Sequence, residues 1–140
     1  MEQVSDRMRR HFVTIQSEQS FREVEALMRA GRLRHVPVVD GEVFAGVLSH
    51  RDLLIDSVAR LEREVPHALL QQLLERSIAP LVSRRPESIG PQASLAEAAA
   101  RMSAFGIGCL PVVEAGPLGP RMLGLVTESD LLAAAYRPIR

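Results

Sequence analysis

The sequence has few of the residues that mark several common kinds of protein. Its 140 residues include one cysteine, no tryptophan and only 4% aromatic residues. The single cysteine, Cys109, cannot form an internal disulfide, and a lone thiol is typical of a reducing compartment, so we expect a cytoplasmic protein. The scarcity of aromatic side chains argues against a surface on which the bases of a single-stranded nucleic acid would stack.

Net charge and long hydrophobic runs are also missing. Seventeen Lys and Arg residues balance seventeen Asp and Glu residues, so no overall field attracts nucleic acid or anionic lipid. No segment approaches the roughly 20 apolar residues that a membrane helix needs. We therefore expect neither a nucleic-acid nor a membrane partner. The hydrophobic content of 46% is enough for the packed core of one domain.

The chain contains an internal repeat. An offset of 74 residues aligns Ile15 with Ile89 and residues 37–39 with 111–113. The offset then becomes 78, and it aligns Gly46, Ser49 and Asp52 with Gly124, Thr127 and Asp130. The change of four residues falls in one place, where the second copy has the longer loop 115–120. A shift confined to one loop is typical of loop insertion, so the halves are predicted to be structural copies.

Each copy predicts the order strand, helix, strand, strand, helix. Ser20 with Glu23, and Ser94 with Glu97, fit the capping box that begins a helix. Gly31 and Gly106 are predicted to end those helices. The strands expected next are 36–39 and 43–48 in the first copy, and 110–113 and 122–126 in the second. Second helices are expected to begin at 49–52 and 127–130.

The copies are expected to form one α/β (α+β) domain. A unit of about 60 residues is marginal by itself, so two β-α-β-β-α repeats should pack on each other. The boundaries are predicted at 4–57 for the first repeat, 58–77 for a helical bridge and 78–136 for the second repeat. Within the bridge, Pro66 is predicted to mark a helix start. Two interpretations of the bridge stay open. It either connects the repeats and covers the sheets, or it forms a dimer contact.

The pairs Ser49/Asp52 and Thr127/Asp130 are the residues best suited to binding. Each places a hydroxyl and a carboxylate where a strand meets a helix, and backbone amides and the helix dipole favour anions there. A carboxylate can accept both hydroxyl protons of a vicinal diol, which suits a ribose. The same spacing is also the ordinary way to cap a helix. Gly46 and Gly124, three residues before each hydroxyl, permit a close backbone approach.

These residues together resemble the CBS (cystathionine-β-synthase-type) domain. The resemblance rests on Ile15 or Ile89, on 36–39 or 110–113, and on 46–52 or 124–130, and it covers about residues 4–57 and 78–136. It implies a pseudo-twofold pair of repeats, a Bateman module, with two clefts that commonly bind adenosine-containing ligands. Those ligands include AMP, ADP, ATP, S-adenosylmethionine and NAD.

The resemblance implies a role for each matching residue. Asp52 and Asp130 would hold ribose hydroxyls, and Ser49 and Thr127 would contact ribose or phosphate. The residues around Ile15, Val36, Ile89 and Leu110 would form the wall of the base-binding site. The full set of candidate binding residues is Ile15, Arg34, His35, Val36, Pro37, Ser49, Arg51, Asp52, Ile89, Cys109, Leu110, Pro111, Thr127 and Asp130.

The copies differ beside the central strand. The first has Arg32-Leu-Arg-His35 where the second has Gly106-Ile-Gly-Cys109. Arginine makes forked contacts with phosphate, so Arg34 and His35 are the candidates for a phosphate chain. Arg51 and the pair Arg84-Arg85 could add to them. The glycines of the second copy would leave room for a bulkier base or belong to an empty cleft, and both alternatives stay open.

No catalytic or metal-binding pattern is present. The four histidines lack metal-ligand spacing, Cys109 is distant from them in sequence, and there is neither a Walker loop nor a GxGxxG fingerprint. We therefore expect a non-catalytic sensor that requires no cofactor and binds AMP, ADP or ATP. By family expectation it would form a homodimer and signal to an unidentified effector protein. The alternative is a ligand-free interaction module that acts through dimerisation.

Overall fold

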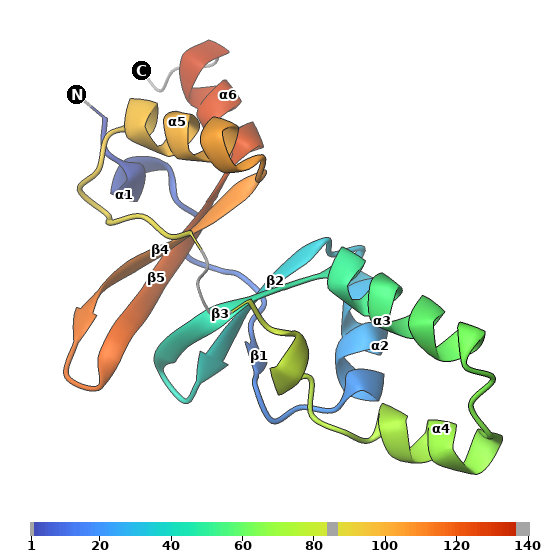
Figure 1. The fold of residues 1–140 in the computed structure, drawn as a ribbon. Coiled ribbons are helices and arrows are strands. Elements are labelled where there is room, and N and C mark those ends of the chain that lie inside the picture. Colours follow the sequence, from blue (N-terminus) through green and yellow to red (C-terminus); the bar gives the residue numbers. More distant parts are fainter. Residues whose placement is uncertain (1, 84–86, 137–140) are drawn as a thin grey trace. The chain divides into compact units, whose positions relative to one another are not determined.

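The computed structural model describes residues 2–83 and 87–136, which form two compact units (Figure 1). The repeat-1 unit contains residues 13–41 and 45–83, and the repeat-2 unit contains 2–12, 42–44 and 87–136. Neither unit is continuous in sequence. The repeat-2 unit contains residues 2–12, which precede the first repeat in the sequence, and the repeat-1 unit contains residues 76–83, which precede the second repeat. We call these two pieces the exchanged segments.

The repeat-1 unit has the predicted order of elements. They are β1 (Ile15–Gln16), α2 (Phe21–Gly31), β2 (His35–Asp40), β3 (Val43–Ser49) and α3 (His50–Glu62). The first two residues of β3 are grouped with the repeat-2 unit. β1 pairs in parallel with β2, with Ile15 opposite Val38, and β2 lies beside β3. The alternating burial of β3 and the fully buried centre of β2 are typical of strands, and the valines of β2 favour an extended conformation.

The bridge continues the repeat-1 unit. α3 runs on to Glu62, and after a short loop α4 (His67–Leu74) begins directly after Pro66, as predicted. A 3-10 turn, η1 (Ala79–Leu81), follows. Arg22 of α2 donates hydrogen bonds to Glu75 (2.7 Å) and Gln71 (2.8 Å). The bridge thus packs on α2, and its two interpretations, a connector that covers the sheets and a dimer contact, both stay predictions.

The repeat-2 unit follows the same plan. Its elements are α1 (Val4–Arg7), α5 (Leu95–Phe105), β4 (Cys109–Gly116), β5 (Gly119–Thr127) and α6 (Glu128–Tyr136). β4 and β5 are antiparallel, with Cys109 opposite Thr127. Ile89 forms a parallel bridge to Val112, which reproduces the pairing of Ile15 with Val38 at the offset of 74.

Each unit has its own hydrophobic core, and an exchanged segment completes it. Ile78, 1% exposed, belongs to the repeat-1 core, and Val4, fully buried, belongs to the repeat-2 core. These two residues are equivalent at the offset of 74. Burying a large aliphatic side chain contributes about 1.5–3 kcal/mol, so each unit gains part of its stability from a segment that the sequence places before the other repeat.

The exchanged segments also pair with strands. Arg9 exchanges two main-chain hydrogen bonds with Leu125 of β5 (2.7 and 2.9 Å), and Ser83 donates to Val47 of β3 (3.0 Å). A Cβ on Gly124 would lie 2.7 Å from the Arg9 oxygen, and one on Gly46 would clash with the Ser83 oxygen and lie 2.6 Å from Val82 Cγ1. The close approach predicted at these glycines is therefore made by the chain itself.

The helix ends agree with the sequence analysis in part. Ser20 and Glu23 form a complete capping box at α2. At α5 Ser94 accepts from the Glu97 amide (3.0 Å), whereas the Glu97 carboxylate accepts instead from Arg101 (3.1 Å). The second predicted box is therefore one-sided, because a nearby guanidinium engages the carboxylate.

One predicted helix end is displaced by a residue. Gly106 adopts the left-handed conformation after α5 (φ 63°), as predicted. After α2 that conformation belongs to Arg32 (φ 52°), and Gly31 is still helical. A Cβ on Gly31 would lie 3.1 Å from Leu33 Cγ, so this glycine makes room for a packed leucine rather than ending the helix. Among the described helices none is long and apolar enough to cross a membrane.

Candidate functional site

The corner of the repeat-1 unit lies where β3 ends and α3 begins. Ser49 is the N-cap of α3, and its Oγ accepts a hydrogen bond from the Asp52 amide (3.1 Å). Asp52 Oδ2 in turn accepts from the Ser49 amide (3.2 Å). Asp52 is half-buried. Of the hydrogen bonds among residues 2–83 and 87–136, none reaches Oδ1 of Asp52, so the capping box uses only one of its two oxygens.

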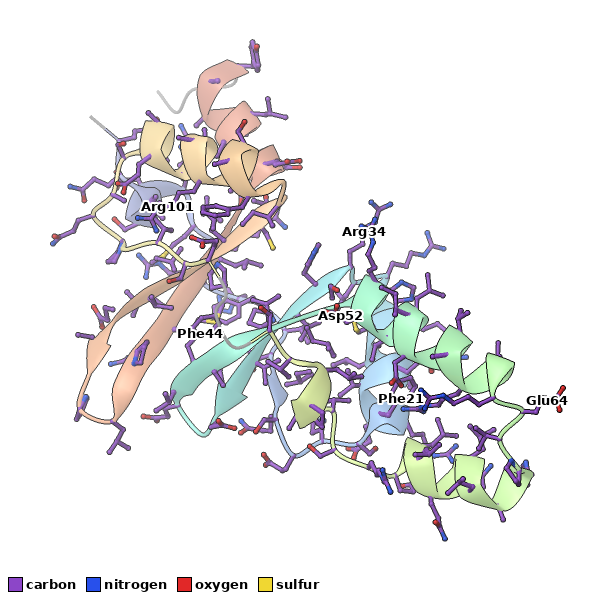
Figure 2. The ribbon with its side chains drawn as sticks, viewed as in Figure 1. Phe21, Arg34, Phe44, Asp52, Glu64 and Arg101 are labelled. Carbon is purple, nitrogen blue, oxygen red and sulfur yellow. The ribbon has the colours of Figure 1, made fainter. Side chains whose placement is uncertain are left out.

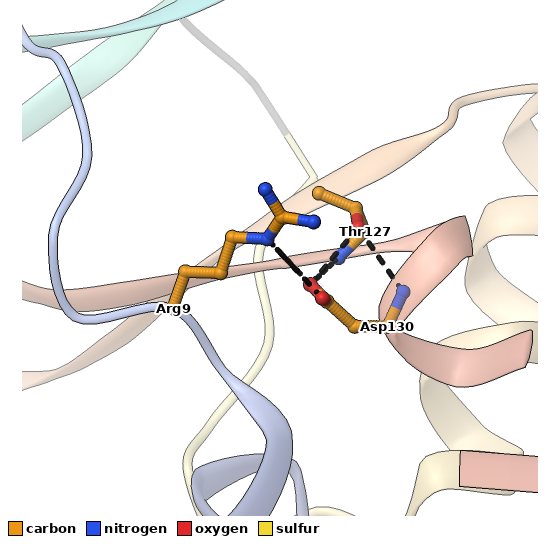
Figure 3. Close-up of polar contacts among 3 residues, drawn as sticks. All are labelled: Arg9, Thr127 and Asp130. Carbon is orange, nitrogen blue, oxygen red and sulfur yellow. Dashed lines mark hydrogen bonds and ion pairs between the residues drawn. The ribbon is translucent and has the colours of Figure 1, made fainter. Parts of the chain in front are cut away.

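The corner of the repeat-2 unit repeats this geometry between β5 and α6. The Asp130 amide donates to Thr127 Oγ1 (3.2 Å), and Asp130 Oδ2 accepts from the Thr127 amide and hydroxyl, both at 2.9 Å. Here a third group is present. Arg9 Nε lies 3.1 Å from Oδ1 and 3.3 Å from Oδ2 of Asp130, as Figure 3 shows. The carboxylate is therefore engaged through both oxygens.

Capping is thus part of what both hydroxyl–carboxylate pairs do. These hydrogen bonds fix each carboxylate in position at the positive end of the helix dipole. Each carboxylate keeps further acceptor positions, since an ionised carboxylate has about four lone-pair sites. Helix capping and ribose binding, the two interpretations left open by the sequence, are compatible with each other at Asp52. One oxygen of Asp52 caps the helix, and the other can accept further hydrogen bonds.

The predicted phosphate-binding cations lie at the same end of the repeat-1 unit as this corner. Arg34 and His35 are exposed at the start of β2, and the Arg34 carbonyl accepts from the His50 amide (2.8 Å) in the first turn of α3. Arg51 is exposed in that turn. Figure 2 shows Arg34 and Asp52 near this end of the unit. The other two candidates, Arg84 and Arg85, lie outside the described residues.

The equivalent place in the repeat-2 unit carries an acid instead. The Gly108 carbonyl accepts from the Glu128 amide (3.0 Å), just as Arg34 accepts from His50. A Cβ on Gly108 would lie 3.6 Å from the Glu128 carboxylate. Burial raises the pKa of the Cys109 thiol, and the negative charge of Glu128 raises that pKa further. Such a thiol stays protonated and unreactive.

The residues expected to wall a base are core residues in this structure. Ile15 and Val36 belong to the repeat-1 core, and Ile89 and Leu110 to the repeat-2 core, each at most 2% exposed. Pro37 and Pro111 are buried as well. Their side chains therefore stabilise the strands that carry the corners. A contact with a base would have to come from main-chain atoms of these strands.

A cavity of about 310 Å³ lies elsewhere in the repeat-1 unit. It is lined mainly by apolar side chains of α2, α3, α4 and the loop between α3 and α4, among them Phe21, Leu61, Val65 and Leu70. Arg60 projects over the Phe21 ring, 4.7 Å from its centre, and forms an ion pair with Asp56. None of the candidate binding residues lines this cavity. The described residues contain no group of three or more side chains suited to a metal ion.

The sequence analysis did not identify Arg9. Its signal was present, because the offset of 74 places Arg9 on Ser83 and so contrasts a cation with a hydroxyl. That contrast has meaning only when the segment before each repeat is known to pair with the other repeat's strand.

The comparisons with known proteins agree with this architecture. The family model for the CBS domain matches residues 3–57 and 76–137. The chain belongs to the CBS domain family. Among curated proteins, an inosine-5'-monophosphate dehydrogenase from Korarchaeum cryptofilum is 29% identical over 130 residues. Those residues are 92% of this chain but only 23% of the relative, so the CBS chain spans about a quarter of that enzyme's length.

Solved structures of CBS domain pairs have the same fold. A Vibrio cholerae protein described as a candidate acetoin utilization protein (AcuB) is 31% identical, with a TM-score of 0.78 over 98% of this chain and 92% of that one. CBSX2 in complex with AMP is 22% identical, with a TM-score of 0.79 and full coverage of both chains. The CBS domain pair of MJ0100, in complex with 5'-methylthioadenosine and S-adenosyl-L-methionine, is 21% identical, with a TM-score of 0.72 over 96% of each chain.

Proposed function

We propose that this CBS pair is a non-catalytic regulatory module that binds an adenosine-containing ligand at its acid corners. The observation that carries the proposal is the repetition of the corner. A hydroxyl and a carboxylate in a capping box stand at the same strand–helix junction in both units. The CBS pairs of similar fold that were solved with AMP or with S-adenosyl-L-methionine support the class of ligand.

Asp52 is proposed to accept hydrogen bonds from the vicinal diol of a ribose. Its Oδ2 caps α3, and Oδ1 supplies acceptor positions for two hydroxyl protons. Ser49 would contact the ribose or the first phosphate, where the amides at the start of α3 favour negative charge. The same roles are proposed for Asp130 and Thr127 at the second corner.

The cations near the Asp52 corner favour a phosphorylated ligand. Arg34, His35 and Arg51 are exposed at the end of the unit where α3 begins, and guanidinium groups make forked hydrogen bonds with phosphate. This is why AMP, ADP or ATP is preferred over S-adenosylmethionine or NAD as the proposed ligand. The acid Glu128 at the second corner would oppose a phosphate chain there.

Ligand binding is proposed to act through a change in the population of two arrangements, which a partner protein would detect. Self-association would use the exposed apolar side chains of the second helices. Among the apolar residues of these helices, Leu53 is buried and Leu131 packs on the repeat-2 core, whereas Leu54, Leu132 and Ala135 are exposed. We propose a homodimer on the basis of this exposed surface, and a cytoplasmic location on the basis of the single cysteine.

A ligand-free interaction module is the second candidate, and one observation favours it. Both carboxylates are already bound to their own backbones, and Asp130 is also bound by Arg9. If capping were their only role, the exposed apolar surface of α3 and α6 would carry the function.

Thermal unfolding with AMP, ATP, S-adenosylmethionine and NAD in turn separates the two candidates. A ligand at 100 times its dissociation constant stabilises the folded state by about 2.7 kcal/mol, which corresponds to roughly 9 °C for a chain of this size. We expect the largest shift with an adenine nucleotide and a much smaller one after Asp52→Ala. An unfolding temperature that no ligand changes would favour the interaction module.

A further inference from the structure

The ion pair between Arg9 and Asp130 is unequally exposed. The Arg9 side chain is 55% exposed and that of Asp130 is 15% exposed. The main chain of Arg9 is held in place by its two hydrogen bonds to Leu125. The main chain of Arg9 is therefore fixed beside β5, and the guanidinium reaches the Asp130 carboxylate from there.

Counting the donors shows how much of Asp130 is available. An ionised carboxylate has about four lone-pair sites. The Thr127 amide, the Thr127 hydroxyl and Arg9 Nε are already bound to it. A vicinal diol needs two acceptor positions, and about one remains. A ribose can therefore bind Asp130 in the proposed manner only if it displaces Arg9.

The repeat-1 corner has a different residue at the position of Arg9. The offset of 74 aligns Arg9 with Ser83, and both residues pair with the same point of their strand, Leu125 and Val47 respectively. Serine is short and uncharged, so it cannot form an ion pair with Asp52. This substitution between the exchanged segments thus adds a further difference between the two corners, one that acts on the carboxylate itself.

We propose that Arg9 determines which corner of this protein binds the nucleoside, by occupying the diol-binding position of Asp130. This inference rests on the proposed function. The Asp52 corner fills first, and the Asp130 corner fills only when a ligand displaces Arg9. Because Arg9 is largely exposed, the ion pair is worth no more than a typical surface pair, so removing it should raise affinity at this corner about two- to fivefold.

The test is calorimetric titration of AMP into Asp52→Asn protein, in which the second corner is read alone. We expect Arg9→Gln in this background to raise the affinity for AMP about two- to fivefold. 2'-Deoxy-AMP, which lacks the diol, should show no such gain. Arg10→Gln, a change at the exposed neighbour, is the matched control and should leave both affinities unchanged. An affinity for AMP that falls or stays the same after Arg9→Gln would overturn the inference.

A measurement without ligand checks the ion pair itself. The Nε–H signal of Arg9 in a nitrogen-15 NMR spectrum should be protected from solvent exchange in the wild-type protein and lose that protection in Asp130→Asn. Unprotected exchange in the wild-type protein would also overturn the inference. Failure of the wild-type protein to bind any of AMP, ADP, ATP, S-adenosylmethionine and NAD would instead overturn the proposed function, and this inference with it.

Discussion

The two acid corners share their main-chain geometry and differ in the side chains that reach them. Both place a hydroxyl and a carboxylate in a capping box at a strand–helix junction. Around Asp52 there are exposed cations, whereas around Asp130 there are Arg9, bound to the carboxylate itself, and Glu128. Duplication thus kept the scaffold that orients each acid, and the surrounding side chains make the two corners unequal.

The exchanged segments show the same contrast. They are equivalent in register, bury equivalent aliphatic residues and approach equivalent glycines. Each unit would lose part of its core without the segment that precedes the other repeat. The symmetry of the main chain can be tested by changing matched pairs of residues in the two units.

The largest effect is expected where the exchanged segments anchor the cores. Ile78→Ala should destabilise the protein by about 4 kcal/mol, because it removes three carbon atoms from a fully packed site and leaves a cavity. Val4→Ala should cost about 2 kcal/mol, since it removes two. Urea unfolding of both variants measures these values. A cost below about 0.5 kcal/mol for either would contradict the assignment of that segment to its core.

The glycines against the exchanged segments come next. Gly46→Ala should cost about 3 kcal/mol and Gly124→Ala about 2 kcal/mol, because each new Cβ meets main-chain oxygen. The cost is lower at Gly124 because its other close neighbour, the flexible Met8 side chain, can move. Gly90→Ala is the control, as a Cβ there meets nothing within 4 Å. Equal stability of all three variants in thermal unfolding would rule out the close approach.

Substitutions at the C-terminal ends of α2 and α5 should change the stability of the protein in opposite directions. Arg32→Gly should stabilise the protein by about 1 kcal/mol, since glycine adopts the left-handed conformation without the cost that a side chain imposes. Gly106→Ala should destabilise it by a similar amount. Guanidinium unfolding of the two variants measures both changes in stability and so compares the end of α2 with the end of α5. Two effects of the same sign would contradict it.

The smallest effect concerns pH. Hydrogen bonds from the Ser20 backbone and hydroxyl lower the pKa of Glu23 below its ordinary value. A lowered pKa in the folded state means that the ionised cap stabilises the protein above the unfolded pKa, and that this gain is lost as the pH falls through the folded value. Glu23→Gln should therefore be less stable than wild type at pH 7, with the gap closing below about pH 4. A gap that does not change with pH would exclude an ionised cap.

Much of the fold could be predicted from local chemistry. The hydroxyl–carboxylate spacing identified the helix starts, the β-branched runs identified β2 and β4, and Pro66 marked the start of α4. These signals depend on neighbours within four residues, so a single sequence contains them. The repeat itself added the equivalence of the halves, and the comparisons confirmed the CBS family and the β-α-β-β-α plan.

What could not be predicted depends on contacts between distant segments. α1 has four residues, too few for a periodic pattern, so nothing local showed that Val4 belongs with the second repeat's core. The ion pair of Arg9 with Asp130 spans 121 residues. The engagement of Glu97 by Arg101 and the packing of Leu33 over Gly31 depended on side-chain directions that spacing does not specify. The roles of the candidate residues toward a ligand stay predictions.

The central claim, that the two acid corners bind a nucleotide unequally, is tested most directly by an NMR titration of the wild-type protein with AMP. The amide signals of residues 49–52 and 127–130 report the two corners separately. We predict saturable shifts of the first group at low AMP and of the second group only at higher AMP. Shifts of both groups with the same midpoint, or of neither, would contradict the account.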